Sequence, residues 1–234
     1  MGNRSRVVVA STGRSLARNG AGSSTLPEVA GYHFRPLVTV FGSSQARPGG
    51  RLYAHALELG RLLGNAGFNL MTGGYRGVME AVSRGAHETG AHVVGVTMGR
   101  FKDNVNRFVM DEIRTANFYE RFGWLVDRAD GYIAMEGGIG TLAEVTFTWQ
   151  ELHLRMLSPR PLVLIGARWR KLFDCFRRNL VPTAGVFAPI ALVDTPEQAT
   201  RLLSRHFREH LRGSQGVNEG RDKSADQQDR IDRH

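Results

Sequence analysis

The chain has only one cysteine and three lysines, and these low numbers argue against several kinds of catalytic chemistry. Its one cysteine, Cys175, cannot form an internal disulfide and lies in a segment of helical spacing. A single cysteine suits a reducing compartment, and we do not expect a catalytic thiol. The three lysines are Lys102, Lys171 and Lys223, and none lies in a glycine-rich loop after a strand. Pyridoxal chemistry needs such a lysine for its Schiff base, so it is disfavoured.

Long hydrophobic runs are also missing. No apolar run approaches the roughly 20 residues of a membrane-spanning helix, and the first residues lack the compact apolar segment of a secretory signal. We therefore expect a cytoplasmic protein without a membrane partner. With 234 residues, of which 41% are hydrophobic, the chain suffices for one large α/β domain, and two domains are not expected.

Several familiar ligand motifs are lacking as well. After the apolar run 37–41, Gly42 is followed by Ser43 and Ser44, so the Gly-x-Gly-x-x-Gly motif of a nicotinamide or flavin site is not met. No Gly-x-x-x-x-Gly-Lys-Ser/Thr motif occurs, which removes the P-loop ATPases. The eight histidines are scattered without the spacing of metal ligands. We expect neither a metal nor a cofactor.

The net charge of +9 is concentrated at the two ends of the chain. Residues 1–35 carry five Arg against one Glu, and residues 201–234 carry eight basic against six acidic residues. The 165 residues between them carry only +3. This central part has no basic stripe with interleaved aromatic residues, which would be typical of a nucleic-acid surface. A nucleic-acid partner is therefore not expected for it.

The two ends also differ from the centre in composition. Residues 1–34 are rich in Arg, Ser, Gly and Ala, and residues 213–234 in Ser, Gln, Asp, Arg and Gly, both without sustained periodicity. Low hydrophobicity without a period predicts a flexible N-terminal extension and a disordered C-terminal tail. Residues 35–212 then form the single domain that carries the function.

Within that domain, short apolar runs alternate with segments of helical spacing. The runs at 37–41, 68–71, 92–97, 131–135, 161–165 and 190–193 have the length and composition of buried strands. Helices are predicted at 52–63, 78–89, 117–128, 141–154, 169–180 and 196–211, and residues 98–115 are predicted to be a functional loop. The alternation predicts an α/β fold, a Rossmann-like parallel sheet with helices on both faces.

Small residues gather where three of the predicted strands end. The loops carry Gly42-Ser43-Ser44, then Thr72-Gly73-Gly74 with Gly77, and then Gly137-Gly138 with Gly140. Ligands of such sheets bind beyond the carboxyl ends of the strands, near the point where the strand order reverses. We therefore expect the three loops to converge on one ligand.

The stretch from strand 131–135 into helix 141–154 is the most informative. Three of the four residues 137–140, which we call the cradle turn, are glycines, so a ligand can approach the backbone closely. The N–H groups at the start of the helix favour an anion such as phosphate. Glu144 lies one turn into the helix and can reach back over this anion. The alternative is a tight strand-to-helix turn followed by a solvated glutamate.

Three motifs follow one another along the chain. They are the second glycine turn, residues 72–77, with Val78-Met79-Glu80 after it; the pair Glu120-Arg121; and the stretch Glu136–Glu144. In this order they resemble the LOG family of cytokinin riboside 5′-monophosphate phosphoribohydrolases. The family signature Pro-Gly-Gly-x-Gly-Thr-x-x-Glu is matched at every fixed position except the first. The resemblance extends from about Leu37 to about Val193 and leaves both ends uncovered.

The resemblance implies hydrolysis of the N-glycosidic bond of a nucleoside 5′-monophosphate, which releases the free base and ribose 5-phosphate. Breaking this bond builds positive charge on the ribose, so a carboxylate near C1′ stabilises the transition state and orients water. Glu144 is the candidate for that catalytic role. Arg121, a permanent cation with a planar fork of donors, is the second catalytic candidate. It holds either the departing base or the ribose and phosphate oxygens.

The other matched residues are expected to bind the substrate. The cradle amides and the Thr141 hydroxyl hold the 5′-phosphate, the second glycine turn forms another wall, and Glu80 accepts hydrogen bonds from ribose hydroxyls. Ser43 either contacts the ligand or caps the next helix. The substrate-binding candidates are therefore Ser43, Gly73, Gly74, Gly77, Glu80, Gly137, Gly138, Gly140 and Thr141.

Two of these candidates have plainer alternatives, and one position departs from the family. Arg121 is otherwise a surface arginine paired with Glu120 or Asp127, and Glu80 a first-turn residue that complements the helix dipole. Glu136 stands where the family has proline, which would fix the φ angle of the turn. Its carboxylate leaves the site intact if it points away. If it points inward, it favours a ligand other than a nucleoside monophosphate or weakens the activity.

Two other functions stay open. The chain also resembles the molybdenum-cofactor carrier proteins of the same fold, which bind a phosphorylated pterin without turning it over, and fold alone does not decide function. A pure carrier has no need of the Arg121 and Glu144 pair, which favours the hydrolase. A nucleotide-sensing or DNA-associated module would depend on the basic ends alone. The LOG resemblance further implies a homodimer whose two-fold interface completes the site.

Overall fold

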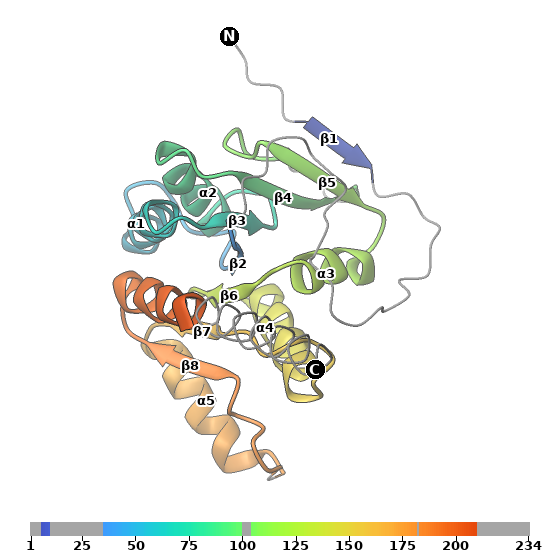
Figure 1. Ribbon diagram of the computed structural model, residues 1–234, viewed down its shortest axis with the longest axis vertical. Helices are drawn as coiled ribbons and strands as arrows, with labels where there is room; N and C mark the ends of the chain where they lie inside the picture. The colour runs from blue at the N-terminus through green and yellow to red at the C-terminus, as the bar shows by residue number, and fades with distance from the viewer. Residues whose placement is uncertain (1–5, 10–34, 100–103, 182, 210–234) are drawn as a thin grey trace, which may run out of the picture. The chain divides into compact units, whose positions relative to one another are not determined.

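A parallel sheet of eight strands organises the chain (Figure 1). The computed structural model describes residues 6–9, 35–99, 104–181 and 183–209. The strands are β1 (Arg6–Val9), β2 (Leu37–Phe41), β3 (Asn69–Thr72), β4 (Val93–Met98), β5 (Asp111–Thr115), β6 (Gly131–Ala134), β7 (Leu162–Ile165) and β8 (Ile190–Val193). The strand order in the sheet is β1-β5-β4-β3-β2-β6-β7-β8. The predicted Rossmann-like α/β fold is confirmed.

Helices connect the strands and cover both faces of the sheet. They are α1 (Arg51–Asn65), α2 (Val78–Glu88), α3 (Phe118–Asp127), α4 (Ile139–His153) and α5 (Ala167–Asn179). Helices α3, α4 and α5 share one apolar core, to which Leu125, Trp149 and Phe173 contribute fully or almost fully buried side chains. Helices α1 and α2 pack on each other and against β3. Among the described residues, no helix is both long enough and apolar enough to cross a membrane.

The helices α1 and α2 approach each other through two glycines. A side chain carbon on Gly60 would lie 2.2 Å from the carbonyl oxygen of Val82, and one on Gly85 would lie 2.1 Å from that of Leu57. Neither position therefore has room for any side chain. This close approach packs α2 tightly against α1.

All six predicted strands are present, with bounds within two residues of the prediction, but β5 was not predicted. Its sequence Asp-Glu-Ile-Arg-Thr lies in the segment 98–115 that we expected to be a loop, because it lacks the apolar composition of a buried strand. Both acidic residues are buried, since each has a partner on a neighbouring segment. Asp111 Oδ2 lies 2.9 Å from His92 Nε2, and Glu112 Oε1 accepts a 2.6 Å hydrogen bond from Thr97 Oγ1.

Part of the expected N-terminal extension is also a strand. Residues Arg6–Val9 form β1, which pairs in parallel with β5 from the Arg6–Asp111 register onward. For these four residues the expectation of a flexible extension is wrong, and the run of β-branched valines explains why. The remainder of 1–34 and the tail 213–234 lie outside the described residues.

The last predicted helix crosses a boundary between two compact units. Residues 196–209 are helical, and the unit that begins at Arg201 is described here only as the helical segment 201–209. Residues 210 and 211 of the predicted helix lie outside the described part of the chain. All the candidate site residues belong to the first unit, which ends at Thr200.

The order of the strands reverses at β2. From β2 the chain builds the sheet through β3, β4 and β5 on one side and, after crossing over, through β6, β7 and β8 on the other. The carboxyl ends of β3, β2 and β6 are therefore adjacent, and these are the three strands that glycine-containing loops follow. The predicted convergence of the three loops is confirmed at this switch point.

Candidate active site

The cradle turn joins β6 to α4 at this edge of the sheet. Gly138 is the N-cap residue of α4 and makes no side-chain capping hydrogen bond. Residues 137–140 are exposed, and a side-chain carbon on Gly138 or Gly140 would meet no atom within 4 Å. The start of α4 is therefore exposed and has no capping side chain. This is the arrangement that favours an anion.

Gly137 has a different role from the other two glycines of the turn. A side-chain carbon there would lie 2.2 Å from Thr141 Oγ1. Thr141 itself is buried, with 4% of its surface exposed. Gly137 is thus required for the turn to fold back onto the helix and bring Thr141 beneath it.

The second glycine turn connects β3 to α2 and lies against two other parts of the site. Gly77 has φ of +77°, and a side-chain carbon on it would lie 2.3 Å from the carbonyl oxygen of Ser43. Gly73 is in contact with α3, since a carbon there would lie 2.1 Å from Arg121 Nη2. The turn therefore lies between the loop after β2 and the Arg121 guanidinium; that it forms a wall of a phosphate site stays a prediction.

Arg121 projects from α3 into the interior, and only 5% of its surface is exposed. Its Nε donates a 3.0 Å hydrogen bond to the carbonyl oxygen of Val96 at β4, and its Nη1 donates one of 3.0 Å to Glu144 Oε1. The interpretation as a surface arginine is therefore wrong. The Glu120 carboxylate instead accepts a hydrogen bond of 2.8 Å from the Ala116 amide, ahead of the helix.

Glu144 lies one turn into α4, as predicted, and its side chain is 13% exposed. Burial raises the pKa of the Glu144 carboxyl above its usual value, because a low-dielectric surrounding disfavours the charged form. The Arg121 guanidinium lowers the pKa again, but burial has the larger effect. A carboxylate of raised basicity that keeps some contact with solvent is suited to orienting a water molecule and accepting its proton.

Two further candidates have less specific surroundings. Ser43 contributes its backbone to the site, because its N–H donates to the carbonyl oxygen of Glu136 at 3.1 Å and its own carbonyl accepts from Val78 at 2.8 Å. It does not cap α1, whose N-cap residue is Gly50. Glu80 lies half-buried in the first turn of α2, a position that suits both of its interpretations.

The sequence reasoning missed Asn106. This buried residue of the β4–β5 connection donates from Nδ2 to the carbonyl oxygens of Gly74 and Tyr75, both at 3.0 Å, and from its backbone to Gly74 at 2.8 Å. It thereby holds the second glycine turn in shape. No sequence signal marks it, since its partners are main-chain atoms about 30 residues earlier in the chain.

Glu136, where the family has proline, directs its side chain away from the cradle turn. Its Oε2 lies 3.4 Å from Arg168 Nε, at the N-terminal end of α5. A side-chain carbon on Gly166 would lie 3.4 Å from its Oε1. The inward orientation, which would favour a different ligand or weaker activity, is not the one observed.

The site brings together the features that the sequence motifs indicate, and comparison with known families agrees. Residues 35–159 match the SLOG cluster4 family, which is more than half of the chain. The chain belongs to the SLOG cluster4 family. The matched range begins before β2 and ends after α4, so it contains both glycine turns, Arg121 and Glu144.

Enzymes of the LOG family are among the relatives of this SLOG chain. It is 34% identical over 126 residues to the cytokinin riboside 5′-monophosphate phosphoribohydrolase LOG of Oryza sativa subsp. japonica, covering 52% of either chain. It is 30% identical over 156 residues to the Mycobacterium tuberculosis cytokinin riboside 5′-monophosphate phosphoribohydrolase, covering 62% of this chain and 82% of that one. The chain thus spans about half the length of the rice relative. The LOG resemblance is confirmed.

Solved structures of the same fold include proteins of another function. The molybdenum cofactor binding protein of Rippkaea orientalis has a TM-score of 0.60 and 26% identity, covering 74% of this chain and 98% of that one. The molybdenum cofactor carrier protein of Chlamydomonas reinhardtii has a TM-score of 0.54 and 22% identity, covering 73% and 97%, and is alike in fold alone. The fold of this SLOG chain therefore accommodates both hydrolases and carriers, and the choice rests on the site.

Proposed function

We propose that this SLOG protein is a nucleoside 5′-monophosphate phosphoribohydrolase, which acts on AMP, on cytokinin riboside 5′-monophosphates, or on both. The observation that carries the proposal is the ion pair between Arg121 Nη1 and Glu144 Oε1, 3.0 Å apart and largely buried. Removing two charges from water costs free energy that their attraction only partly offsets, so such a pair contributes little to stability. A catalytic role accounts for it better than a structural one.

In the proposed reaction, the amides of the cradle turn hold the 5′-phosphate and so place the ribose beside Glu144. As the C1′–N bond breaks, its electron pair leaves with the base, and the Glu144 carboxylate stabilises the positive charge on the ribose. A water molecule oriented by Glu144 adds its oxygen to C1′. Its proton passes to the carboxylate and then to the base or to solvent. Arg121 orients Glu144 and stabilises negative charge on the leaving group or the phosphate.

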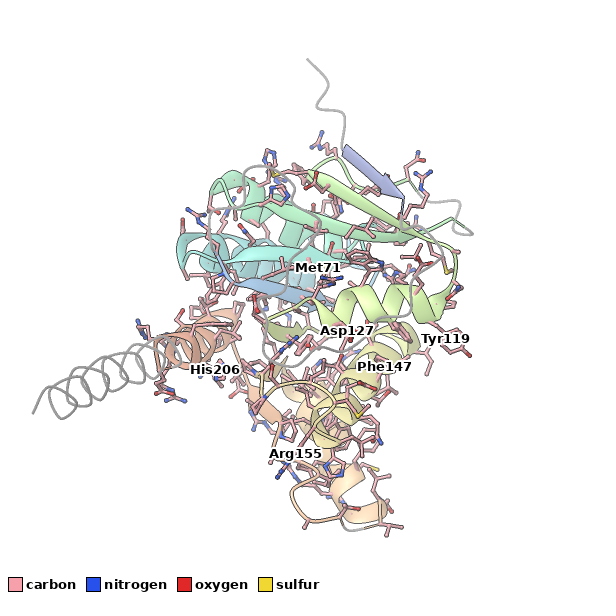
Figure 2. All side chains as sticks on the ribbon, turned by 45° about the vertical axis from the view of Figure 1, so that its right-hand side comes forward. Met71, Tyr119, Asp127, Phe147, Arg155 and His206 are labelled. Atoms are coloured by element: carbon pink, nitrogen blue, oxygen red, sulfur yellow. The ribbon has the colours of Figure 1, made fainter. Side chains whose placement is uncertain are left out.

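The same two helices support the proposal of a homodimer. Phe118 is 51% exposed and Tyr119 is 88% exposed on α3, and Phe147 is 37% exposed on α4. The Phe122 ring lies between them, 6.1 Å from the Phe118 ring and 5.4 Å from that of Phe147. Figure 2 shows Tyr119 projecting from α3 and Phe147 on α4 beside it. An aromatic patch of this kind, next to Arg121 and Glu144, is suited to a two-fold contact that adjoins both sites.

The decisive test is a nucleotide panel assayed by chromatography of the released base. AMP and cytokinin riboside monophosphates are incubated with the wild-type protein and with the variants Glu144→Gln and Arg121→Ala. We expect base and ribose 5-phosphate in equal amounts from the wild type, and release slowed by about a hundredfold or more in each variant.

The carrier is the alternative outcome of the same experiment, and the likeness to the Rippkaea orientalis protein is the observation in its favour. Binding of each nucleotide is measured in parallel by calorimetry. If no nucleotide yields free base while anion binding is retained, the hydrolase proposal fails and the carrier function is favoured. If the panel gives base at a rate that neither variant changes, the assignment of Arg121 and Glu144 is wrong.

A further inference from the structure

Glu136 places a negative charge next to the proposed anion site, and its side chain is turned toward α5. Glu136 immediately precedes the cradle turn, and its carbonyl oxygen accepts a hydrogen bond from the Ser43 amide at 3.1 Å. An unneutralised carboxylate so close to an anion site would weaken the binding of phosphate by simple repulsion. Its side chain, however, is only 25% exposed and faces the start of α5.

The beginning of α5 supplies the compensating charge. Arg168 Nε lies 3.4 Å from Glu136 Oε2, and the Arg168 side chain is 84% exposed, so it is not required for folding of the core. The uncapped N-terminus of the helix, whose N-cap residue is Gly166, adds the positive end of its dipole on the same side. Both features attract the Glu136 carboxylate and so favour the outward orientation of its side chain.

The same segment is fixed in place by the surrounding sheet. Gly166 has φ of +112° and donates from its amide to the carbonyl oxygen of Val193 at 2.9 Å. The buried Trp169 donates from Nε1 to the carbonyl oxygen of Met135 at 3.1 Å. Residues on both sides of Arg168 are thus attached to β8 and to Met135, the residue between β6 and Glu136. A side chain on this segment has a defined position relative to Glu136.

We propose that Arg168 is a positioning residue for phosphate binding, which acts by holding and neutralising the Glu136 carboxylate outside the cradle turn. In the family, proline restrains the conformation of this turn; in this chain, the contact between Glu136 and Arg168 of α5 provides the restraint. The same contact offsets the repulsion between the Glu136 carboxylate and a bound phosphate. The inference rests on the proposed function only in that the anion is taken to be a sugar phosphate. Arg168 itself does not touch the anion.

A double-mutant cycle tests the inference by equilibrium binding, which does not depend on turnover. Ribose 5-phosphate and inorganic phosphate, neither of which has an N-glycosidic bond to hydrolyse, are titrated calorimetrically into the wild type, Arg168→Ala, Arg168→Lys, Glu136→Gln and the double variant Arg168→Ala/Glu136→Gln. Arg178→Ala is the matched control, an exposed arginine near the other end of α5. Circular dichroism melting of every variant checks that the fold is unchanged.

The inference predicts that Arg168→Ala weakens binding of both ligands about fivefold, while Arg168→Lys and Arg178→Ala change it by less than about twofold. Removing the Glu136 charge as well restores binding to within about twofold of the wild type. For AMP hydrolysis, Arg168→Ala raises KM and leaves kcat close to the wild-type value, because the transition state is not contacted.

Two results would overturn the inference. Unchanged binding in Arg168→Ala would show that Glu136 needs no compensation. Binding that stays weak in the double variant would show that Arg168 contacts the anion directly. A wild-type protein that binds AMP but releases no base would refute the proposed hydrolysis and leave the binding cycle fully interpretable, so the two failures are distinguishable.

Discussion

Arg121 connects three parts of the site through one planar side chain. It contacts Glu144 on α4, the carbonyl oxygen of Val96 at β4, and Gly73 in the second glycine turn. The resemblance to the LOG family was enough to name both candidates from the sequence, Glu144 from the family signature and Arg121 from the upstream Glu120-Arg121 pair. That the two side chains meet, 23 residues apart in the chain, depends on the crossing of α3 and α4 and was not readable from local pattern.

The three contacts of Arg121 predict that lysine cannot replace it. Arg121→Lys keeps the positive charge, but a single ammonium group cannot bond the Val96 carbonyl and the Glu144 carboxylate in the geometry of the guanidinium fork. We expect base release to fall at least about tenfold. Arg84→Lys, at an exposed pair with Glu88, is the control and should leave the rate unchanged. Equal rates for Arg121→Lys and the wild type would show that charge alone is sufficient.

The raised pKa of Glu144 predicts the acid side of the pH–rate profile. The carboxylate is the reactive form, so activity is lost as the pH falls through its pKa, and burial moves that pKa above the value of an ordinary glutamate. The acid limb of kcat against pH should therefore have its midpoint above that value. The profile of base release, measured with saturating AMP, gives this midpoint directly. A limb centred at or below an ordinary glutamate pKa would contradict the burial of the reactive group.

At the scale of the elements, amino-acid composition predicted the apolar strands correctly but suggested a loop where β5 lies. A strand is recognisable when its apolar side chains are numerous, but Asp111 and Glu112 are buried through partners on other segments. Such pairing is a tertiary property and leaves no trace in the strand's own sequence. The glycine turns were more predictable, because the need for small residues at a strand end is local. Asn106 could not be predicted, because a residue that stabilises a turn about 30 residues earlier in the chain has no local sequence pattern.

The contact between the second glycine turn and α3 predicts the effect of one added methyl group. In Gly73→Ala the new carbon would lie 2.1 Å from Arg121 Nη2 and 2.7 Å from Met79 Sδ, so the guanidinium must move. We expect base release to fall at least about tenfold, since misplacing a catalytic group by about 1 Å has effects of this size.

Gly123→Ala in α3 is the matched control for this substitution. Its new carbon would have Asp127 Oδ2 as nearest neighbour at 3.9 Å, an ordinary contact distance. Alanine favours the helix by up to about 1 kcal/mol over glycine, so thermal unfolding should show equal or greater stability with unchanged activity. Full activity in Gly73→Ala would mean that the Arg121 position is not critical.

For the whole molecule, alternation of apolar runs and helical segments was sufficient to predict the sheet and the edge at which the three glycine-containing loops meet. Right-handed crossovers allow few strand orders for such a chain. The glycine-containing loops then indicated which strands lie beside the point where the strand order reverses. The participation of β1 and β5 could not be predicted, so the strand order was incomplete on that side. Similarly, chemistry could be inferred only from the site, because the chain resembles a phosphoribohydrolase in sequence and a molybdenum cofactor binding protein in fold.

The aromatic patch on α3 and α4 predicts a dimer and identifies a substitution that should disrupt it. We expect the wild type to sediment as a dimer at micromolar concentration. Tyr119→Lys places a charge on the patch and should shift the protein to monomers, because burying an unpaired ammonium group is strongly unfavourable. Val181→Lys, at a residue 85% exposed on the loop after α5, should remain dimeric. Sedimentation of Tyr119→Lys like the wild type would place any dimer contact elsewhere.

The attachment of Asn106 to Gly74 and Tyr75 bears on the order in which the protein assembles during its synthesis. A nascent chain that has emerged from the ribosome only as far as α2 already contains the second glycine turn, but not the residue that gives it its shape. Arg121 and then Glu144 emerge later still. The glycine turn that is made first is thus held in shape by a residue made later, and the pair of Arg121 and Glu144 forms only when α4 has been synthesised and docked.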